Sequence, residues 1–154
     1  MQGSGKSTES DFIMQYVLGD AVSINSGTEP LLTPYNKSLL GKIYVVFEEL
    51  PVFSQAQWSG VSSTAKKIAT NPRLDYRTLY ESPINAENVA NLVINTNCES
   101  IKDSNGRRII IMPVNNSKME DHVKFGHIRD NCFNMEVGEC FYAYMKSLNI
   151  ALVF

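Results

Sequence analysis

Met1-Gln2-Gly3-Ser4-Gly5-Lys6-Ser7-Thr8 is the stretch that decides the fold. It follows the phosphate-binding pattern G-x-x-x-x-G-K-[ST], except that the first glycine of the pattern would fall one residue before Met1. Glycine tolerates positive φ, which lets backbone N–H groups turn toward a phosphate. The predicted phosphate-binding residues are Gly3, Ser4, Gly5, Lys6, Ser7 and Thr8. Lys6 would reach the terminal phosphates and Ser7 would ligate Mg²⁺; the alternative is a flexible Gly/Ser tail.

A helix is predicted directly after this stretch. Phe12, Ile13, Tyr16 and Val17 fall at helical spacing, and Gly19 ends the run. The positive end of this helix would point at the same anion as the loop. A short strand is then predicted over residues 21–25.

The second informative stretch is Lys42-Ile43-Tyr44-Val45-Val46-Phe47-Glu48-Glu49. Its consecutive apolar residues predict a strand buried on both faces, as in a parallel sheet covered by helices. Glu48 and Glu49 stand at the carboxyl end, where ligands of open α/β sheets bind. We expect Glu48 to hold Mg²⁺ and Glu49 to polarise the water that attacks a γ-phosphate. Two solvated acids at the end of a strand are the alternative.

A helix over residues 54–71 and a basic, aromatic hairpin follow. The helix begins with a capping box at Ser54-Gln55-Ala56-Gln57 and ends at Asn71-Pro72. In the hairpin, cations would hold the phosphates of a single nucleic-acid strand, and a ring would meet its bases. The candidate DNA-binding residues are Lys66, Lys67, Arg73, Arg77 and Tyr80. A solvated surface loop explains the same residues.

Another buried strand is predicted over residues 91–97. Asn97 at its end would lie beside the two carboxylates, where a side-chain amide can orient the attacking water. A turn-forming asparagine is the alternative.

Asn105-Gly106 then predicts a tight turn before a strand at residues 109–113. Arg107 and Arg108 precede that strand. Either arginine can serve as a finger for the nucleotide of a neighbouring subunit, or as an ordinary surface cation.

Two helices are predicted near the end of the sequence. Ser117-x-x-Glu120 is a capping box that opens a helix toward Asp130, and Asn134 caps the next one. The second helix has an apolar stripe suited to core or partner-helix packing, formed by Val137, Cys140, Phe141, Tyr144, Met145 and Leu148.

Composition narrows the class of protein. A chain of 154 residues with 44% hydrophobic residues predicts one globular domain. The net charge of −2 gives no global basic field, so any nucleic-acid contact must come from a local cluster. No apolar run approaches the ~20 residues that span a bilayer, so we expect an intracellular protein, in the cytoplasm or nucleus of a host cell, with no membrane partner.

The three cysteines are an odd number without CxxC spacing, which favours reduced thiols. A zinc site built from Cys98, His122, His127 and Cys132 is an alternative whose spacing fits no tight knuckle.

In order, GSGKST, KIYVVFEEL, the basic hairpin, NLVINTN and GRRIIIMPV resemble the superfamily III helicase domain. In particular, the chain looks like the helicase part of viral and mobile-element primase-helicases, the group allied to poxvirus-type and NrS-1 polymerase-like proteins. The resemblance implies an α/β fold of the P-loop NTPase, AAA+-like kind. A parallel-sheet core would carry flanking helices and a helical C-terminal end, here residues 121–148 with Phe125.

The resemblance also implies an activity. Such domains bind ATP and Mg²⁺, assemble into a ring, usually a hexamer, and translocate along single-stranded DNA during replication. Lys6 and Ser7 match the phosphate and Mg²⁺ positions, and the acidic motif and the sensor fall on Glu48, Glu49 and Asn97. The DNA-contacting motif falls on Lys67, Arg77 and Tyr80, and the finger on Arg107 or Arg108.

By the same resemblance, we expect a single domain truncated at its phosphate loop, without the first strand of its sheet. Residues 1–116 would form the ATPase core and residues 117–149 the C-terminal helices. A primase domain or other replication proteins would be the partners. The alternatives are an inactive fragment that serves as an interaction module, and a P-loop small-molecule kinase, which would need an acceptor site and lid arginines.

Overall fold

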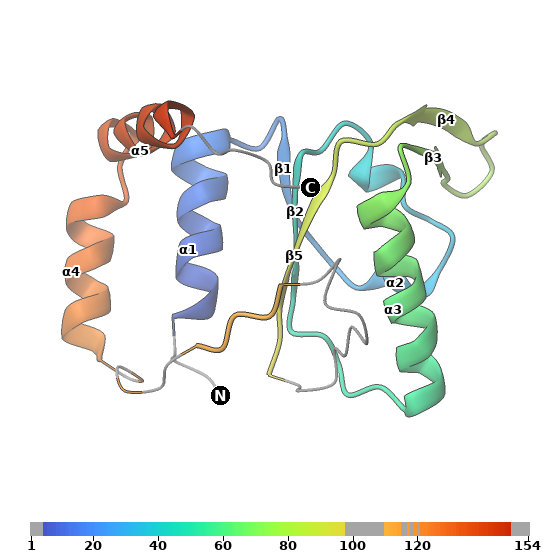
Figure 1. The fold of residues 1–154 in the computed structure, drawn as a ribbon, viewed down its shortest axis with the longest axis horizontal. Helices are drawn as coiled ribbons and strands as arrows, with labels where there is room; N and C mark the ends of the chain where they lie inside the picture. The colour runs from blue at the N-terminus through green and yellow to red at the C-terminus, as the bar shows by residue number, and fades with distance from the viewer. Residues whose placement is uncertain (1–4, 98–109, 115–116, 118, 120, 149–154) are drawn as a thin grey trace. The chain divides into compact units, whose positions relative to one another are not determined.

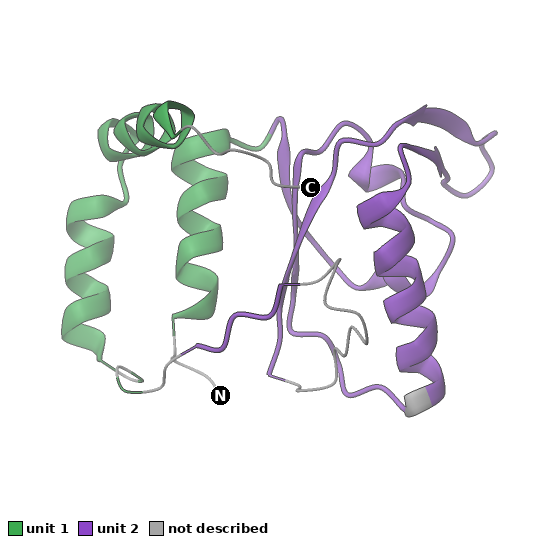
Figure 2. Cartoon of the chain, viewed as in Figure 1, with its two compact units in different colours: residues 1–20, 115–154 green, residues 21–114 purple. Residues whose placement is uncertain are grey.

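A computed structural model describes residues 5–97, 110–114, 117, 119 and 121–148. The chain forms two compact units (Figure 2): residues 1–20 with 115–154, here unit 1, and residues 21–114, here unit 2. Residues 1–20 therefore group with the C-terminal helices. The resemblance described above instead implies that they belong to the ATPase core. Each unit is described by itself.

Unit 2 is built on a parallel sheet of three strands. Strand β1 (Ser23–Ser26), strand β2 (Tyr44–Glu48) and strand β5 (Asn91–Asn95) lie in the order β1-β2-β5 (Figure 1). Residues 45–47 of β2 are fully buried, which confirms the prediction from its unbroken apolar run. The α/β fold class with a parallel sheet is likewise confirmed.

Helix α3 (Gln55–Thr70) covers the sheet. Its first turn is closed by the predicted capping box, in which the Ser54 hydroxyl accepts from the Gln57 N–H and the Gln57 side chain accepts from the Ser54 N–H. Val61, Ala65 and Ile68 recur at helical spacing and pack into the core that contains Val45 and Phe47. The core thus fixes β2 against α3.

The short helix α2 (Glu29–Leu32) and the 3₁₀ turn η2 (Lys37–Leu39) connect β1 to β2, and the hairpin lies between α3 and β5. Strand β3 (Arg73–Tyr76) pairs antiparallel with strand β4 (Ile84–Glu87). The hairpin is tied to the segment before η2, because the Arg77 N–H donates to the side chain of Asn36 and the Arg77 carbonyl accepts from the Asn36 and Lys37 N–H groups. An ion pair between Lys37 and Glu81 adds a further link.

Unit 1 is helical. Helix α1 (Lys6–Phe12) continues into the π-helix η1 (Ile13–Leu18), and helices α4 (His122–Cys132) and α5 (Met135–Ser147) complete the unit. Its centre is aromatic: the ring of Phe12 lies 5.6 Å, centroid to centroid, from the rings of both Phe133 and Phe141. Gly138 of α5 packs on the backbone of Tyr16 in η1. Only a residue without a side chain fits there.

The C-terminal predictions need corrections. The strand expected over residues 109–113 is wrong for 110–113, which have no regular secondary structure and are exposed. The first C-terminal helix begins at His122, because Asp121 accepts from the Lys124 N–H and caps it, so the Ser117-x-x-Glu120 box does not open it. The Asn134 cap is confirmed, since its side chain accepts from the Val137 N–H.

The apolar stripe of α5 is only partly buried. Val137 and Phe141 are half-buried, whereas Cys140, Tyr144, Met145 and Leu148 are exposed. Among the described residues, no helix has the length and apolar character needed to cross a membrane.

Candidate functional site

The described part of the phosphate-binding stretch lies at the start of α1. Gly5 is the N-cap and adopts a left-handed backbone with φ of 77°, and its carbonyl accepts from the Thr8 N–H at 3.1 Å. Lys6 is the first residue of α1, and Ser7 and Thr8 lie in its first turn. Gly3 and Ser4 lie outside the described residues. Gly5 therefore provides the positive φ that the loop pattern requires.

Phe125 of α4 lies directly against Gly5. A Cβ added at Gly5 would overlap the edge of the Phe125 ring. The sequence associated Phe125 only with the helical end of the domain. Its contact with the loop depends on how α4 packs against α1, which the local pattern does not contain.

The acidic pair lies at the carboxyl end of β2, as predicted. Glu48 is its last residue and half-buried, and Glu49 is exposed just beyond it. Glu49 has a left-handed backbone with φ of 49°, which is uncommon for a residue with a side chain. The chain bends at Glu49, so the regular strand backbone ends at Glu48.

Asn95 contacts both members of the pair, and the sequence analysis missed it. Its side-chain amide donates to Oε1 of Glu48 at 3.3 Å, and its carbonyl accepts from the Glu49 N–H at 3.1 Å. The register of β2 and β5 places Glu48 opposite Asn95. Asn97, the predicted sensor, lies two residues beyond β5 and is exposed. The register between β2 and β5 identifies Asn95, and the sequence does not contain it. The sequence shows where the strands lie but not how they align.

The candidate DNA-binding residues come from α3 and the hairpin. Lys66 and Lys67 lie in the last turns of α3, and Lys67 is exposed. Arg73 donates to the side chain of Asn85 at 2.7 Å and to its carbonyl at 3.1 Å. Arg77 pairs with Asp75 at 3.8 Å, with both side chains about half exposed. Arg73 and Arg77 thus each have a partner within the hairpin.

Tyr80 lies in the loop between β3 and β4. Its side chain is fully exposed and its backbone is left-handed, with φ of 63°. Exposed Leu79 lies next to it. An aromatic ring held out from a hairpin loop is suited to stacking on a base.

Tyr76 anchors this hairpin in the core of unit 2. It is almost fully buried at the end of β3, and burial raises the pKa of its phenol above the usual value. The residue therefore links the exposed loop to the packed part of the unit.

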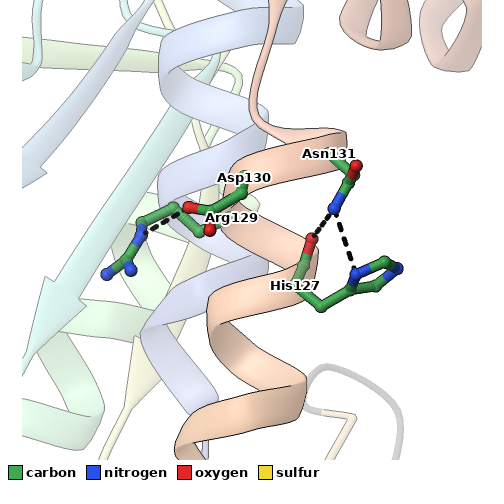
Figure 3. A network of polar contacts seen from close by, with 4 residues as sticks. All are labelled: His127, Arg129, Asp130 and Asn131. Carbon is green, nitrogen blue, oxygen red and sulfur yellow. Dashed lines mark hydrogen bonds and ion pairs between the residues drawn. The ribbon is translucent and has the colours of Figure 1, made fainter.

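The zinc alternative has no support among the described residues. No group of three or more His, Cys, Asp or Glu side chains in that part of the chain is placed to hold a metal, and Cys98 lies outside it. In Figure 3, the ring of His127 faces Asn131 along one side of α4, and its Nδ1 lies 3.1 Å from the Asn131 amide nitrogen. On the other side of α4 in this view, Arg129 and Asp130 form an exposed ion pair.

The remaining predicted residues fall into separate groups. Arg107 and Arg108 lie outside the described residues. Gly5, Lys6, Ser7 and Thr8 belong to unit 1, whereas the acidic pair, Asn95, the α3 lysines and the hairpin belong to unit 2.

The donor types fit the expected ligands: a lysine and a hydroxyl beside a left-handed glycine suit a phosphate, and hard carboxylate oxygens suit Mg²⁺.

Solved structures with the same fold include three apo structures of the NrS-1 C-terminal region. Their TM-scores to this chain are 0.75, 0.71 and 0.62, with sequence identities of 21%, 21% and 20%. The matches cover 98%, 97% and 98% of this chain and 36%, 35% and 35% of theirs, so this chain spans about a third of their length. A search of curated proteins found no significant match.

The family comparison extends over most of the chain. Residues 1–108, which include the phosphate-binding stretch, the acidic pair, Asn95 and the hairpin, match the profile of a Family of unknown function, DUF5906. Because this match covers more than half of the 154 residues, the chain belongs to the DUF5906 family.

Proposed function

We propose that this chain is the ATP-binding part of a ring-forming DNA helicase of the superfamily III kind, which acts in the replication of a virus or mobile element. The observation that carries the proposal is that one chain holds both a Gly-Lys-Ser sequence at a helix start and two carboxylates at the end of a buried parallel strand. The fold shared with the NrS-1 C-terminal region supports it.

Each residue group has a distinct task in this proposal. Lys6 would bind the terminal phosphates, and Ser7 and Glu48 would hold Mg²⁺, which would supply positive charge against the phosphates. Glu49 accepts a proton from the attacking water, and Asn97 orients that water. An arginine, Arg107 or Arg108, reaches the γ-phosphate from a neighbouring copy of the chain.

Nucleotide binding is tested by thermal unfolding with and without MgATP. A ligand at 100 times its Kd stabilises the folded state by about 2.7 kcal/mol, so Tm of the wild-type chain should rise. Lys6→Ala should lose this rise. Lys146→Ala, which removes an exposed lysine of α5, should keep it. A wild-type chain that MgATP does not stabilise would contradict the proposal and favour an inactive fragment.

The chemical step is tested by ATP turnover. Glu49→Gln should bind ATP and fail to hydrolyse it, because the amide cannot accept a proton. If turnover appears only when a small-molecule acceptor is added, the kinase alternative is correct. If Arg107→Ala and Arg108→Ala, alone and together, turn over ATP like the wild type, neither arginine is the finger.

DNA binding is tested on the hairpin by fluorescence anisotropy with single-stranded DNA. Stacking on one base contributes about 1–3 kcal/mol, so Tyr80→Ala should weaken binding about 5-fold or more. Lys67→Ala should weaken binding. It should also make the slope of log binding constant against log salt concentration shallower by about 0.7. Tyr144→Ala removes an exposed tyrosine of α5 and serves as the control. Equal affinity of Tyr80→Ala and Tyr144→Ala would contradict the role of Tyr80.

A further inference from the structure

We propose that Asn95 is the positioning residue that aims the Glu48 carboxylate at Mg²⁺. The inference rests on the proposed function and adds to it a residue that neither the motif pattern nor the family description assigns. Asn95 reaches Glu48 from the neighbouring strand, and its amide donates to Oε1 of Glu48 at 3.3 Å.

The geometry of the sheet makes this contact specific. Glu48 and Asn95 are opposite each other in the parallel ladder and are the last residues of β2 and β5. Both side chains are half-buried, so solvent competes less for the hydrogen bond than it would at a fully exposed site. The amide contacts one carboxylate oxygen and thereby limits the rotation of the group.

A second contact of Asn95 uses its backbone and therefore survives substitution of the side chain. Its carbonyl accepts from the Glu49 N–H at 3.1 Å, at the point where Glu49 takes a left-handed φ of 49°. Loss of the Asn95 amide therefore acts on the direction of Glu48 and leaves the turn at Glu49 tied to β5.

A neutral amide suits this task. It donates a hydrogen bond to the carboxylate and carries no positive charge of its own, so it does not repel a cation at the same site. Groups that orient a metal ligand in this way typically contribute 10- to 100-fold to metal affinity. The structure thus predicts that Asn95 acts on Mg²⁺ and has little direct effect on the nucleotide.

The test separates these two effects with a fluorescent ATP analogue. Its affinity is measured first in EDTA and then during a Mg²⁺ titration, for the wild type, Asn95→Leu, Asn95→Ala and Asn95→Gln. Asn95→Leu keeps the side-chain size and loses the donor, so its Mg²⁺ midpoint should rise 10-fold or more. Its affinity in EDTA should equal that of the wild type. Asn95→Gln keeps a carboxamide and should lie closer to the wild type than Asn95→Leu does.

The matched control is Asn91, at the other end of the same strand. Its amide donates to the Ile43 carbonyl at 3.1 Å, far along β5 from the acidic pair. Asn91→Ala should leave the Mg²⁺ midpoint unchanged.

The outcomes are distinguishable. If the wild type binds the analogue in a Mg²⁺-dependent way and Asn95→Leu titrates identically, the inference is wrong and the proposed function stands. If Asn95→Leu and Asn95→Ala weaken binding equally in EDTA and in Mg²⁺, the residue is merely structural and the inference is again wrong. A wild type without any Mg²⁺-dependent binding overturns the proposed function and this inference together.

Discussion

Gly5 and Glu49 both have a left-handed backbone, with φ of 77° and 49°, but only one of them is a glycine. For a residue with a side chain, this conformation costs on the order of 1–2 kcal/mol. At Gly5 the chain avoids that cost, and the absence of a side chain also leaves room for the Phe125 ring. At Glu49 the backbone carries this strain, and strained residues of this kind cluster at functional sites.

Two glycine substitutions should therefore have opposite effects on stability. Gly5→Ala should lower the free energy of unfolding by about 2 kcal/mol, because it combines the left-handed strain with a clash against Phe125. Gly60→Ala, in the middle of α3 with open space around it, should raise stability by up to about 1 kcal/mol. Urea unfolding of both variants measures the contrast. A neutral Gly5→Ala would show that the loop relaxes.

At Glu49, glycine should be more stable than alanine. Both variants remove the carboxylate, so their difference isolates the backbone conformation. We expect Glu49→Gly to exceed Glu49→Ala by about 1 kcal/mol in free energy of unfolding, measured in urea. If alanine is the more stable, the left-handed conformation is not under strain in solution.

Tyr76 should make stability depend on alkaline pH. Its pKa is raised in the folded state, so the unfolded chain loses the phenolic proton first as the pH increases. The contribution is fully present below about pH 10, the usual tyrosine value, and is lost as pH rises through the folded pKa. Urea unfolding between pH 8 and about pH 11 should show a smaller alkaline loss for Tyr76→Phe. Equal losses in wild type and variant would contradict this assignment.

At the scale of elements, the sequence predicted those features that depend on neighbours along the chain. The α3 capping box, the buried β2 run and the hairpin that follows α3 all carry local signals. The expected strand at 110–113 failed, because an apolar run needs a ladder partner as well as β-forming residues. Asn95 was missed for a related reason, since its role follows from the register between two strands.

The contact between α5 and η1 should tolerate no added side chain. Gly138→Ala would place a methyl group onto the Tyr16 carbonyl, and overpacking of this kind costs about 1–3 kcal/mol. Gly126→Ala in α4 has open space and should be neutral or slightly stabilising. Thermal unfolding followed by circular dichroism compares the two. Similar melting temperatures would mean that α5 shifts to accept the methyl group.

At the scale of the whole molecule, the two units differ in how much they bury. Unit 2 holds a continuous apolar core around residues 45 and 47, whereas α4 in unit 1 has no buried residue. Hydrogen bonds near exposed surfaces open at lower free energy than those in a packed core. If the two units differ in stability, a single midpoint fitted to the unfolding curve averages two separate transitions.

Hydrogen exchange should reveal this difference. Amides of β2 should exchange more slowly than those of α4, because β2 is the middle strand of the described sheet and its residues 45–47 are fully buried. Peptide-resolved mass spectrometry of residues 44–48 and 122–132 measures both. Equal protection would show that the units open together as one cooperative body.

The grouping of the first 20 residues with the C-terminal helices also has a consequence for biosynthesis. A ribosome makes residues 21–114 before it makes α5, and domains generally fold as units during synthesis. Unit 2 can therefore begin to fold before α1 meets Phe133 and Phe141 and before η1 meets Gly138. The phosphate-binding glycine therefore meets its Phe125 partner only after residues 21–114 have been made.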